Sequence, residues 1–197
     1  MSEPTTTAQP DPSAVPGEGT LGPSIERFDR RVDEAFDRLR GNETLDQVFQ
    51  AASTAGDFSL VWHALGGVRG LATRRVDQVL ILAIGLGIES LIVNQGVKRL
   101  FRRPRPTQQG VEGLEVRQPS TSAFPSGHAS AATFAVVLLS AWERPSRVAG
   151  WAAVGALVAT SRVYVRIHHA SDVIGGVVIG AGLGWAARRV ARRVSPR

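Results

Sequence analysis

Cysteine is absent from the 197-residue chain, so disulfide bonds, thiolate metal ligands and cysteine nucleophiles are excluded together. The chain also lacks a linker that would separate two apolar cores, and its length fits a single domain. Any catalysis must therefore come from histidine, carboxylate, hydroxyl and basic side chains of one domain.

Acidic residues are scarce beyond the first part of the chain. The net charge is +6, but residues 1–57 hold eleven of the seventeen acidic residues and five of the twenty-three basic ones. The remainder therefore carries eighteen basic and six acidic side chains. These bases lie between long apolar runs and lack the interleaved aromatic residues of an RNA-binding surface. We therefore expect no nucleic-acid partner. The basic residues are instead expected to face a membrane that carries anionic groups.

Large apolar side chains are nearly missing from residues 1–24, which are rich in proline, threonine, serine and glycine. Such a composition cannot bury enough surface to offset chain entropy, so a disordered tail is predicted there. Residues 25–57 are predicted to form an amphipathic helical region. Its apolar residues recur at intervals of three and four, at Ile25, Phe28, Val32, Phe36 and Leu39. This region either packs on the rest of the protein or lies on a membrane surface.

Long apolar runs occupy most of the remaining chain, at residues 58–72, 78–97, 126–142, 148–165 and 173–187. Each run alone is compatible with a soluble core helix, but the series favours membrane-spanning helices with arginines that reach the interface. We therefore predict an all-α fold: a multi-pass transmembrane helical bundle embedded over 58–190 and followed by a basic tail at 191–197. His63 and Arg69 interrupt the first run, so its spanning of the membrane stays open.

Two features within these runs predict how the helices pack. Gly176, Gly180 and Gly184 repeat every four residues and form a smooth stripe that a neighbouring helix can approach closely. Glu89 lies inside the second run, where an ionised carboxylate must face the bundle or a polar cavity. Both a structural and a functional role are compatible with that position.

Two clusters of polar residues fall at the ends of apolar runs. Lys98 is followed, after six residues, by Arg105 and Pro106. The second cluster, Pro-Ser-Gly-His at 125–128, opens the third run, where a helix start would point free N–H groups at an anion. Taken alone, the first cluster is also typical of a lipid-facing anchor and the second of an ordinary helix cap.

The third cluster consists of Ser161 and Arg162, then five residues, His168, three residues, and Asp172. If one helix covers both, the four-residue separation places His168 and Asp172 on one face. The carboxylate would then accept the proton on one ring nitrogen and leave the other nitrogen free to attack. A purely structural pair is the alternative.

Together the three clusters resemble the motifs of the type 2 phosphatidic acid phosphatase superfamily, which includes membrane lipid phosphatases and soluble vanadium haloperoxidases. Eleven specified positions between Lys98 and Asp172 match in order and internal spacing. The resemblance implies that cationic side chains surround the phosphoryl oxygens, with neutral donors at the helix start. These phosphate-binding residues are Lys98, Arg105, Ser126, Gly127 and Arg162.

The resemblance also implies the chemistry. His168 would attack phosphorus to give a phosphohistidine, with Asp172 fixing the histidine tautomer. His128 would protonate the leaving group and then activate the water that hydrolyses the intermediate. Neither a metal nor a cofactor is implied, because the cationic side chains neutralise the phosphate charge.

The implied activity is hydrolysis of a lipid phosphate or diphosphate in a membrane. Phosphatidate, phosphatidylglycerol phosphate and polyprenyl phosphates or diphosphates all place phosphate at headgroup depth while the tail remains in lipid. Two other functions stay open: a non-catalytic membrane scaffold or lipid-binding relative, and a vanadate-dependent haloperoxidase. The short chain and the apolar helices argue against the haloperoxidase.

Threading the five apolar runs through a bilayer places all three clusters on one side. The other side receives arginines from two connections and from the C-terminal end. Cytoplasmic segments carry an excess of basic residues, so that other side is predicted to be cytoplasmic. We therefore expect a plasma-membrane protein whose active site opens on the extracytoplasmic face.

Overall fold

The computed structural model describes residues 21–106 and 119–196 of the chain. Within these residues the regular structure is helical, in agreement with the predicted all-α fold. The α-helices are α1 (Pro23–Asp37), α2 (Glu43–Ala55), α3 (Leu60–Thr73), α4 (Val76–Ser90), α5 (Gly127–Leu139), α6 (Pro145–Tyr164) and α7 (Ala170–Val194).

Three short helical segments complete the structure. The 3₁₀-helix η1 (Asp57–Ser59) joins α2 to α3. Helix α4 continues through the π-helical η2 (Leu91–Gly96) and the 3₁₀-helix η3 (Val97–Leu100). The region 25–57 thus holds two helices and the start of η1, and α7 extends to Val194, into the segment predicted as a basic tail at 191–197. Residues 1–20 of the predicted tail at 1–24 lie outside the described residues.

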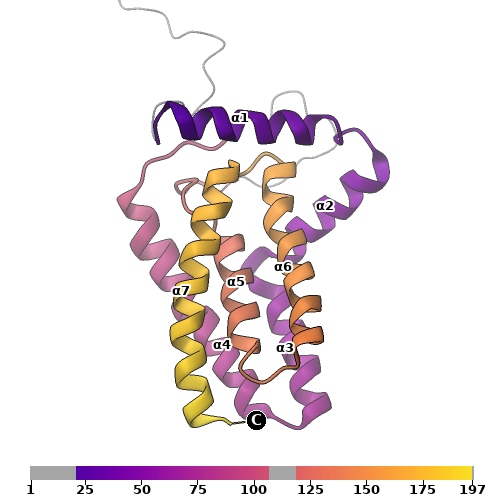
Figure 1. Cartoon of the computed structure of the whole chain (residues 1–197), viewed down its shortest axis with the longest axis vertical. Coiled ribbons are helices and arrows are strands. Elements are labelled where there is room, and N and C mark those ends of the chain that lie inside the picture. Colours follow the sequence, from indigo (N-terminus) through magenta and orange to yellow (C-terminus); the bar gives the residue numbers. More distant parts are fainter. Residues whose placement is uncertain (1–20, 107–118, 197) are drawn as a thin grey trace, which may run out of the picture.

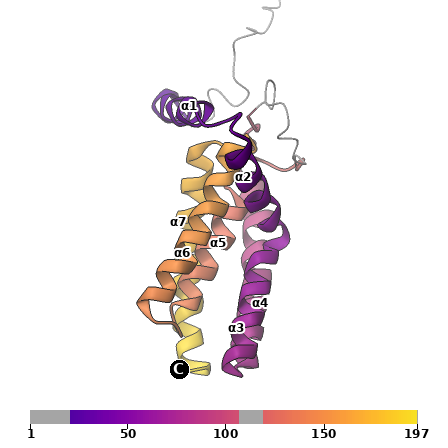
Figure 2. The ribbon, with the colours of Figure 1, turned by 90° about the vertical axis from the view of Figure 1, so that its right-hand side faces the viewer.

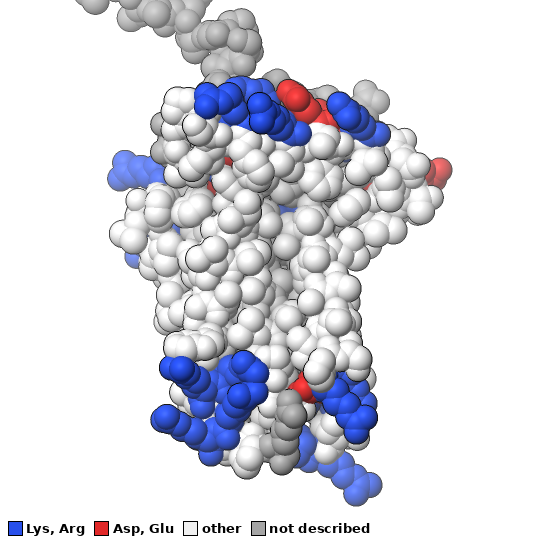
Figure 3. All heavy atoms as spheres, in the orientation of Figure 1, with Lys and Arg blue, Asp and Glu red and all other residues white. Residues whose placement is uncertain are grey.

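Helices α3 to α7 lie side by side along the long axis, while α1 lies across one end of the bundle and α2 slants down from it (Figures 1 and 2). Two continuous helical stretches, Val76–Leu100 and Ala170–Val194, are long and apolar enough to cross a membrane. The face in Figure 3 has basic side chains at both ends and a wide uncharged zone between them. This distribution suits a bundle whose middle lies in hydrocarbon and whose ends meet water.

Helix α5 is the centre of the bundle and packs most extensively against α7. Most of its buried residues are alanine or serine, and Phe134, Leu138 and Leu139 are the larger ones. The predicted glycine stripe is the reason for the close approach: a Cβ at Gly180 would overlap the Ser130 carbonyl oxygen, and one at Gly184 would lie 3.0 Å from the Phe134 oxygen. The predicted tight packing is confirmed.

This packing also fixes the ends of the two helices. The Ser126 backbone N–H donates to the Asp172 carbonyl oxygen at 2.9 Å, so the first turns of α5 and α7 are tied together. The Ser126 side chain caps α5 by accepting from the Ala129 N–H at 3.5 Å. Two of the sequence clusters therefore meet at the same end of the bundle.

Candidate active site

The end of the bundle near α1 encloses a cavity of about 590 Å³. Side chains from all three sequence clusters line it, although 64 residues separate Lys98 from Arg162. The site residues named from the sequence that line this cavity are Lys98, Arg105, Gly127, His128, Arg162 and His168. Three cations and two imidazoles therefore face one space that exceeds the volume of a phosphate group.

His168 lies in the connection between α6 and α7, before the helix begins at Ala170. The condition that one helix covers both His168 and Asp172 is therefore not met. The pair still forms, because Asp172 is in the first turn of α7 and its Oδ2 lies 3.6 Å from His168 Nδ1. The chain reverses direction between the two helices and brings the imidazole back over the helix start.

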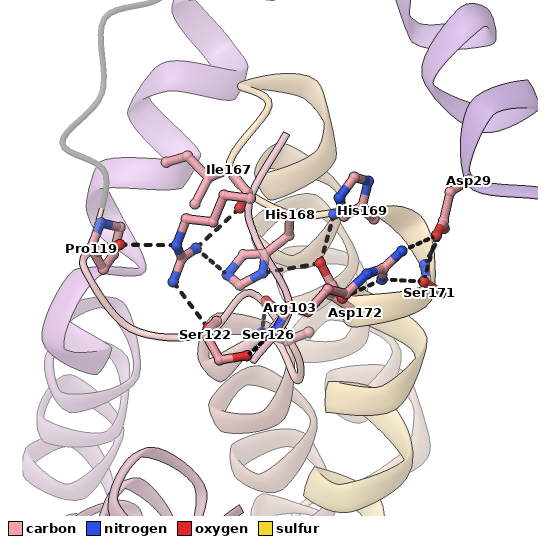
Figure 4. A network of polar contacts seen from close by, with 12 residues as sticks. Asp29, Arg103, Pro119, Ser122, Ser126, Ile167, His168, His169, Ser171 and Asp172 are labelled. Carbon is pink, nitrogen blue, oxygen red and sulfur yellow. Dashed lines mark hydrogen bonds and ion pairs between the residues drawn. The ribbon is translucent and has the colours of Figure 1, made fainter. Parts of the chain in front are cut away.

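The tautomer of His168 follows from its neighbours (Figure 4). Its Nε2 lies 3.2 Å from Arg105 Nη1. A guanidinium has donors only, so Nε2 must be the accepting nitrogen and Nδ1 carries the proton that faces Asp172. Burial lowers the pKa of His168 to about 3, with Arg105 acting in the same direction and the hydrogen bond to Asp172 opposing it. His168 is therefore a neutral imidazole whose unprotonated nitrogen faces the cationic side of the cavity.

Arg105 is held in place by backbone carbonyl groups. Its Nε donates to the Pro119 oxygen at 3.0 Å, and its Nη1 donates to the Ile167 oxygen at the same distance. Burial lowers the pKa of Arg105, while Asp172 raises it. Guanidinium groups titrate far above neutral pH, so this side chain remains cationic. The carbonyl contacts orient the fork without neutralising its charge.

The other two cations come from two different helical elements. Lys98 is on η3, and Arg162 is in the last turn of α6, where its Nη1 donates to both side-chain and backbone oxygens of Ser53 on α2. A Cβ added at Gly127 would lie 3.2 Å from Asn94 Oδ1 and 3.8 Å from Lys98 Nζ. A glycine at this helix start therefore keeps open the space beside the ammonium group.

Two of the site residues named from the sequence do not line the cavity. Ser126 is fully buried, and its hydroxyl oxygen caps α5. Asp172 is also fully buried and lies behind His168. Figure 4 shows Ser126 below the imidazole and the carboxylate of Asp172 beside it. Asp172 has the place expected of a residue that fixes a tautomer, whereas the Ser126 hydroxyl is directed to its own helix.

Sequence reasoning missed Asp57, which lines the cavity and contacts His128 with 3.0 Å between Oδ1 and Nε2. Asp57 lies 71 residues before His128, and no spacing rule links the two. Glu89, for which the sequence left a structural and a functional role open, lies in the cavity wall, where its carboxylate is buried and accepts a hydrogen bond from Ser130. The requirement that Glu89 face the bundle or a polar cavity is met by this position.

A second missed group lies directly behind Asp172. Arg103 is buried and contacts the carboxylates of both Asp172 and Asp29. Asp29 is on α1, where the helical pattern placed it on the polar side, yet it is almost fully buried. The only sequence signal was the density of arginine at 102, 103 and 105, which does not distinguish a buried arginine from exposed ones. His169 is the N-cap residue of α7, and its backbone N–H donates to Asp172 Oδ2 at 2.8 Å.

Histidine and carboxylate side chains are not clustered as a metal site requires in the described part of the chain. Among the residues that the structure describes, no group of three or more histidine or carboxylate side chains is placed to hold a metal ion. The arrangement offers instead three cationic side chains, two imidazoles, the buried carboxylates of Glu89 and Asp172 and the partly exposed carboxylate of Asp57. The cationic side chains suit an anion with several oxygens, which is the form of a phosphoryl group.

The family to which the chain belongs follows from a match to a protein-family model. The model of the PAP2 superfamily matches residues 78–195, which is more than half of the chain and contains all three clusters. The chain belongs to the PAP2 superfamily. The resemblance seen in the motifs is thereby confirmed, and the PAP2 chain is a member of a family of membrane lipid phosphatases.

Several curated PAP2 relatives are named for polyprenyl lipids. The chain is 32% identical over 133 residues to decaprenylphosphoryl-5-phosphoribose phosphatase of Mycobacterium tuberculosis, covering 66% of this chain and 71% of that protein. It is 34% identical over 134 residues to the protein of the same name from Mycolicibacterium smegmatis, covering 64% and 68%. It is 30% identical over 112 residues to the putative undecaprenyl-diphosphatase YbjG of Escherichia coli, covering 56% and 55%.

Two solved PAP2 structures share the fold. A transmembrane phosphatidylglycerolphosphate phosphatase from Bacillus subtilis superposes with a TM-score of 0.69 at 22% identity, covering 88% of this chain and 89% of that one. LpxE from Aquifex aeolicus superposes with a TM-score of 0.66 at 22% identity, covering 89% and 99%. The predicted multi-pass transmembrane bundle is therefore confirmed as the fold, and the protein is located in a membrane.

Proposed function

We propose that this PAP2 protein is a metal-independent lipid phosphatase that forms a phosphohistidine on His168. One observation carries the proposal: the unprotonated Nε2 of His168 lies 3.2 Å from Arg105 Nη1, and His168 lines the same cavity as Lys98, Arg105 and Arg162. A neutral imidazole is a nucleophile, and the three cations supply the charge that holds a phosphoryl group. In a cavity without these cations, the same imidazole would have no neighbouring group that binds the phosphoryl oxygens.

The cations explain the proposed independence from metals. During phosphoryl transfer, charge spreads over the non-bridging oxygens, and catalysis consists mainly of positioning and charge stabilisation. Two guanidinium forks and an ammonium group already in place stabilise that charge without reorganisation. The free N–H groups at the start of α5, beside Gly127, add donors that favour an anion.

The bond changes follow from the two histidines. His168 Nε2 attacks phosphorus, the bond from phosphorus to the leaving oxygen breaks, and His128 donates a proton to that oxygen. His128 then accepts a proton from a water molecule, whose oxygen attacks the phosphohistidine. Inorganic phosphate leaves, and the neutral imidazole is restored. Asp172 stabilises the positive charge that the ring of His168 carries while phosphorylated.

The site suits a lipid substrate because of its depth in the bundle. Lys98 lies on η3 and Arg162 in the last turn of α6, both at helix ends. Figure 3 shows an uncharged zone between the two charged ends of the bundle. A phosphate at headgroup level reaches this depth while its tail remains in hydrocarbon. We propose a polyprenyl phosphate or diphosphate as the first substrate to test, because the curated relatives from mycobacteria and E. coli are named for polyprenyl lipids.

The proposed location is the plasma membrane, with the active site on the extracytoplasmic face. The connections between α3 and α4 and between α5 and α6 lie at the end away from the cavity, together with the C-terminal end of α7 (Figure 1). These segments carry many arginines, and the positive-inside rule assigns such segments to the cytoplasm. A substrate would then be dephosphorylated after its headgroup has reached the outer leaflet.

The experiment is phosphate release by the purified full chain in detergent micelles, with and without EDTA. The panel contains phosphatidate, phosphatidylglycerol phosphate, a polyprenyl phosphate and a polyprenyl diphosphate. We expect release that EDTA leaves unchanged and that His168→Ala abolishes, together with an acid-labile phosphoenzyme that accumulates in His128→Ala. Release by His168→Ala at the wild-type rate would refute the nucleophile. A folded wild-type protein that releases no phosphate from any of the four lipids would favour a non-catalytic relative.

A further inference from the structure

Arg103 lies outside the matched motif positions, yet it is more deeply buried than the arginines of the cavity. Its side chain is 1% exposed and is enclosed by Asp172 of α7 and Asp29 of α1. Both carboxylates are also buried, with side chains 0% and 6% exposed. Burying three charged groups together is costly unless their geometry is well satisfied. Here both terminal nitrogens of Arg103 have carboxylate partners, while its Nε has no hydrogen-bond partner, and the cluster adjoins the nucleophile.

The carboxylate of Asp172 is held by two donors. Its Oδ1 accepts from Arg103 Nη1 at 2.5 Å, and its Oδ2 accepts from the His169 backbone N–H at 2.8 Å. Oδ2 is also the oxygen that faces His168 Nδ1. Both carboxylate oxygens are therefore fixed from behind, and the carboxylate has little freedom to rotate. Its orientation sets the direction in which the imidazole of His168 is held.

Arg103 is itself held between α1 and α7 (Figure 4). Its Nη2 donates to Asp29 Oδ2 at 2.6 Å, and its Nη1 donates to Ser171 Oγ at 2.7 Å. Ser171 in turn donates to both oxygens of Asp29, from its backbone N–H at 2.8 Å and from its hydroxyl at 2.7 Å. The guanidinium is therefore clamped on one edge by α1 and on the other by α7.

The charges of Asp29, Arg103 and Asp172 do not cancel. An isolated pair of Arg103 and Asp172 would be neutral and would attract a charged imidazole only weakly. Asp29 is a second carboxylate on the same guanidinium, so the group of three carries a net negative charge. Opposite charges interact strongly where water is excluded. Asp29 therefore lets Asp172 keep its attraction for the phosphorylated, positively charged ring of His168 while Arg103 holds it in place.

We propose that Arg103 and Asp29 are positioning residues that act on the nucleophile His168 through Asp172. The proposal rests on the function proposed above. Because Asp29 belongs to α1, the seating of this helix across the end of the bundle becomes a condition for full activity. Helix α1 thus contributes to catalysis although none of its residues lines the cavity that holds the cations.

The first test is steady-state kinetics of the purified full chain with a polyprenyl phosphate in detergent micelles. We expect Arg103→Gln to lower kcat by about tenfold or more and to leave KM within about twofold, since misplacement of a reacting group affects the rate of the chemical step. Arg103→Lys keeps a cation without the fork and should recover part of this loss. Asp29→Asn should lower kcat less than Arg103→Gln does. Arg102→Gln, at the neighbouring exposed position, is the matched control and should behave as wild type.

Non-additivity separates positioning from a merely structural role. If Arg103 acts through Asp172, the loss caused by Arg103→Gln should largely disappear in an Asp172→Asn background. Thermal unfolding of each variant is measured alongside, and Asp29→Asn carries the test if Arg103→Gln does not fold. Wild-type kcat in both Arg103→Gln and Asp29→Asn would overturn the proposal. The proposal would also be overturned if the double variant lost kcat by the full product of the two single-variant losses.

A second measurement does not depend on turnover. Histidine ¹⁵N spectra, with the His168 signals identified by their loss in His168→Ala, report which ring nitrogen carries the proton. We expect the proton on Nδ1 in both proteins, because Arg105 still faces Nε2, and a weaker hydrogen bond from this N–H to Asp172 in Arg103→Gln, seen as an upfield shift of its proton resonance. An unchanged Nδ1–H resonance in Arg103→Gln would overturn the positioning role, whatever the substrate proves to be. Failure of the proposed function would show separately, as phosphate release that survives in His168→Ala.

Discussion

The imidazole of His128 faces the carboxylate of Asp57, with 3.0 Å between Nε2 and Oδ1. The contact joins the first turn of α5 to η1, the short segment between α2 and α3. Two consecutive residues of this segment, Phe58 and Ser59, have φ angles of 52° and 57°. Left-handed backbone at residues other than glycine costs about 1 kcal/mol or more each, and such strain often accompanies functional sites. Here it accompanies the turn that presents Asp57 to the cavity.

The first prediction concerns this pair. Asp57→Asn removes the charge that orients the imidazole of His128 and stabilises its protonated form, so protonation of the leaving oxygen becomes slower. We expect kcat for an alkyl or prenyl phosphate to fall by about tenfold to a hundredfold, the usual range for losing an aid to acid catalysis. For 4-nitrophenyl phosphate, whose leaving group needs no proton, the fall should be much smaller.

Glu43→Gln is the matched control for Asp57→Asn, because it removes an exposed acid from the start of α2. It should leave both substrates unaffected. Equal losses for both substrates in Asp57→Asn would contradict the assignment, because a disturbed pocket slows all substrates alike.

A second prediction follows from the burial of His168. Its pKa is lowered to about 3, so the ring stays neutral as pH falls from 7 to about 5, whereas an exposed histidine protonates near 6.5. Below about pH 6.5 the unfolded chain therefore binds a proton that the folded chain does not, and the free energy of unfolding decreases as the solution becomes more acidic.

Histidine ¹⁵N spectra of the phosphate-free protein between pH 7 and 5 measure this directly, with His168→Ala used to identify the signals. The His168 ring should show no titration in that window. A midpoint near 6.5 would contradict the buried, neutral nucleophile. A parallel series of thermal melts should show the wild type losing more stability with acid than His168→Ala does.

The sequence was sufficient for the main features of the fold because apolar runs and charge placement are local signals. Each of the five runs lies largely within a helix, and the glycine stripe has the predicted packing role. Boundaries were less accurate, since α7 continues to Val194 where arginines can extend beyond the hydrocarbon. The non-α turns of η2 and η3, which present Asn94 and Lys98, leave no local signal in composition.

The sequence predicted only those cavity residues that belong to the three clusters. The convergence of Lys98, Arg105, Arg162 and both histidines followed from the clusters and the topology. Asp57 and Asp29 were not found, because each acts across a long stretch of chain on a partner that no spacing relates to it. In α1 an acidic residue between apolar ones predicts a solvated face, and only the packing of α1 on α7 shows that Asp29 is buried.

The third prediction tests the packing of α5 on α7. Gly180→Ala places a methyl group on the Ser130 backbone, which cannot move aside as a side chain can. We expect a loss of stability of about 1–3 kcal/mol, the usual cost of overpacking, together with reduced activity because Ser126 and Asp172 shift apart. Thermal unfolding in detergent measures the loss.

Gly182→Ala is the control for Gly180→Ala, since a Cβ there meets no atom within 4 Å. It changes the same residue type in the same helix and should keep or slightly raise stability, because alanine favours helices. Similar melting temperatures for the two variants would contradict the close contact between α5 and α7.

The last prediction concerns the side of the membrane on which the cavity opens. The absence of cysteine makes single-cysteine labelling unambiguous. Ser120→Cys places a thiol at an exposed position beside the cavity, and Ser146→Cys places one at the exposed start of α6, at the opposite end. If the arginine-rich end is cytoplasmic, a membrane-impermeant maleimide added to intact cells should label Ser120→Cys and not Ser146→Cys. Permeabilised cells should show labelling of both thiols. Labelling of Ser146→Cys alone in intact cells would reverse the orientation and place phosphate release in the cytoplasm.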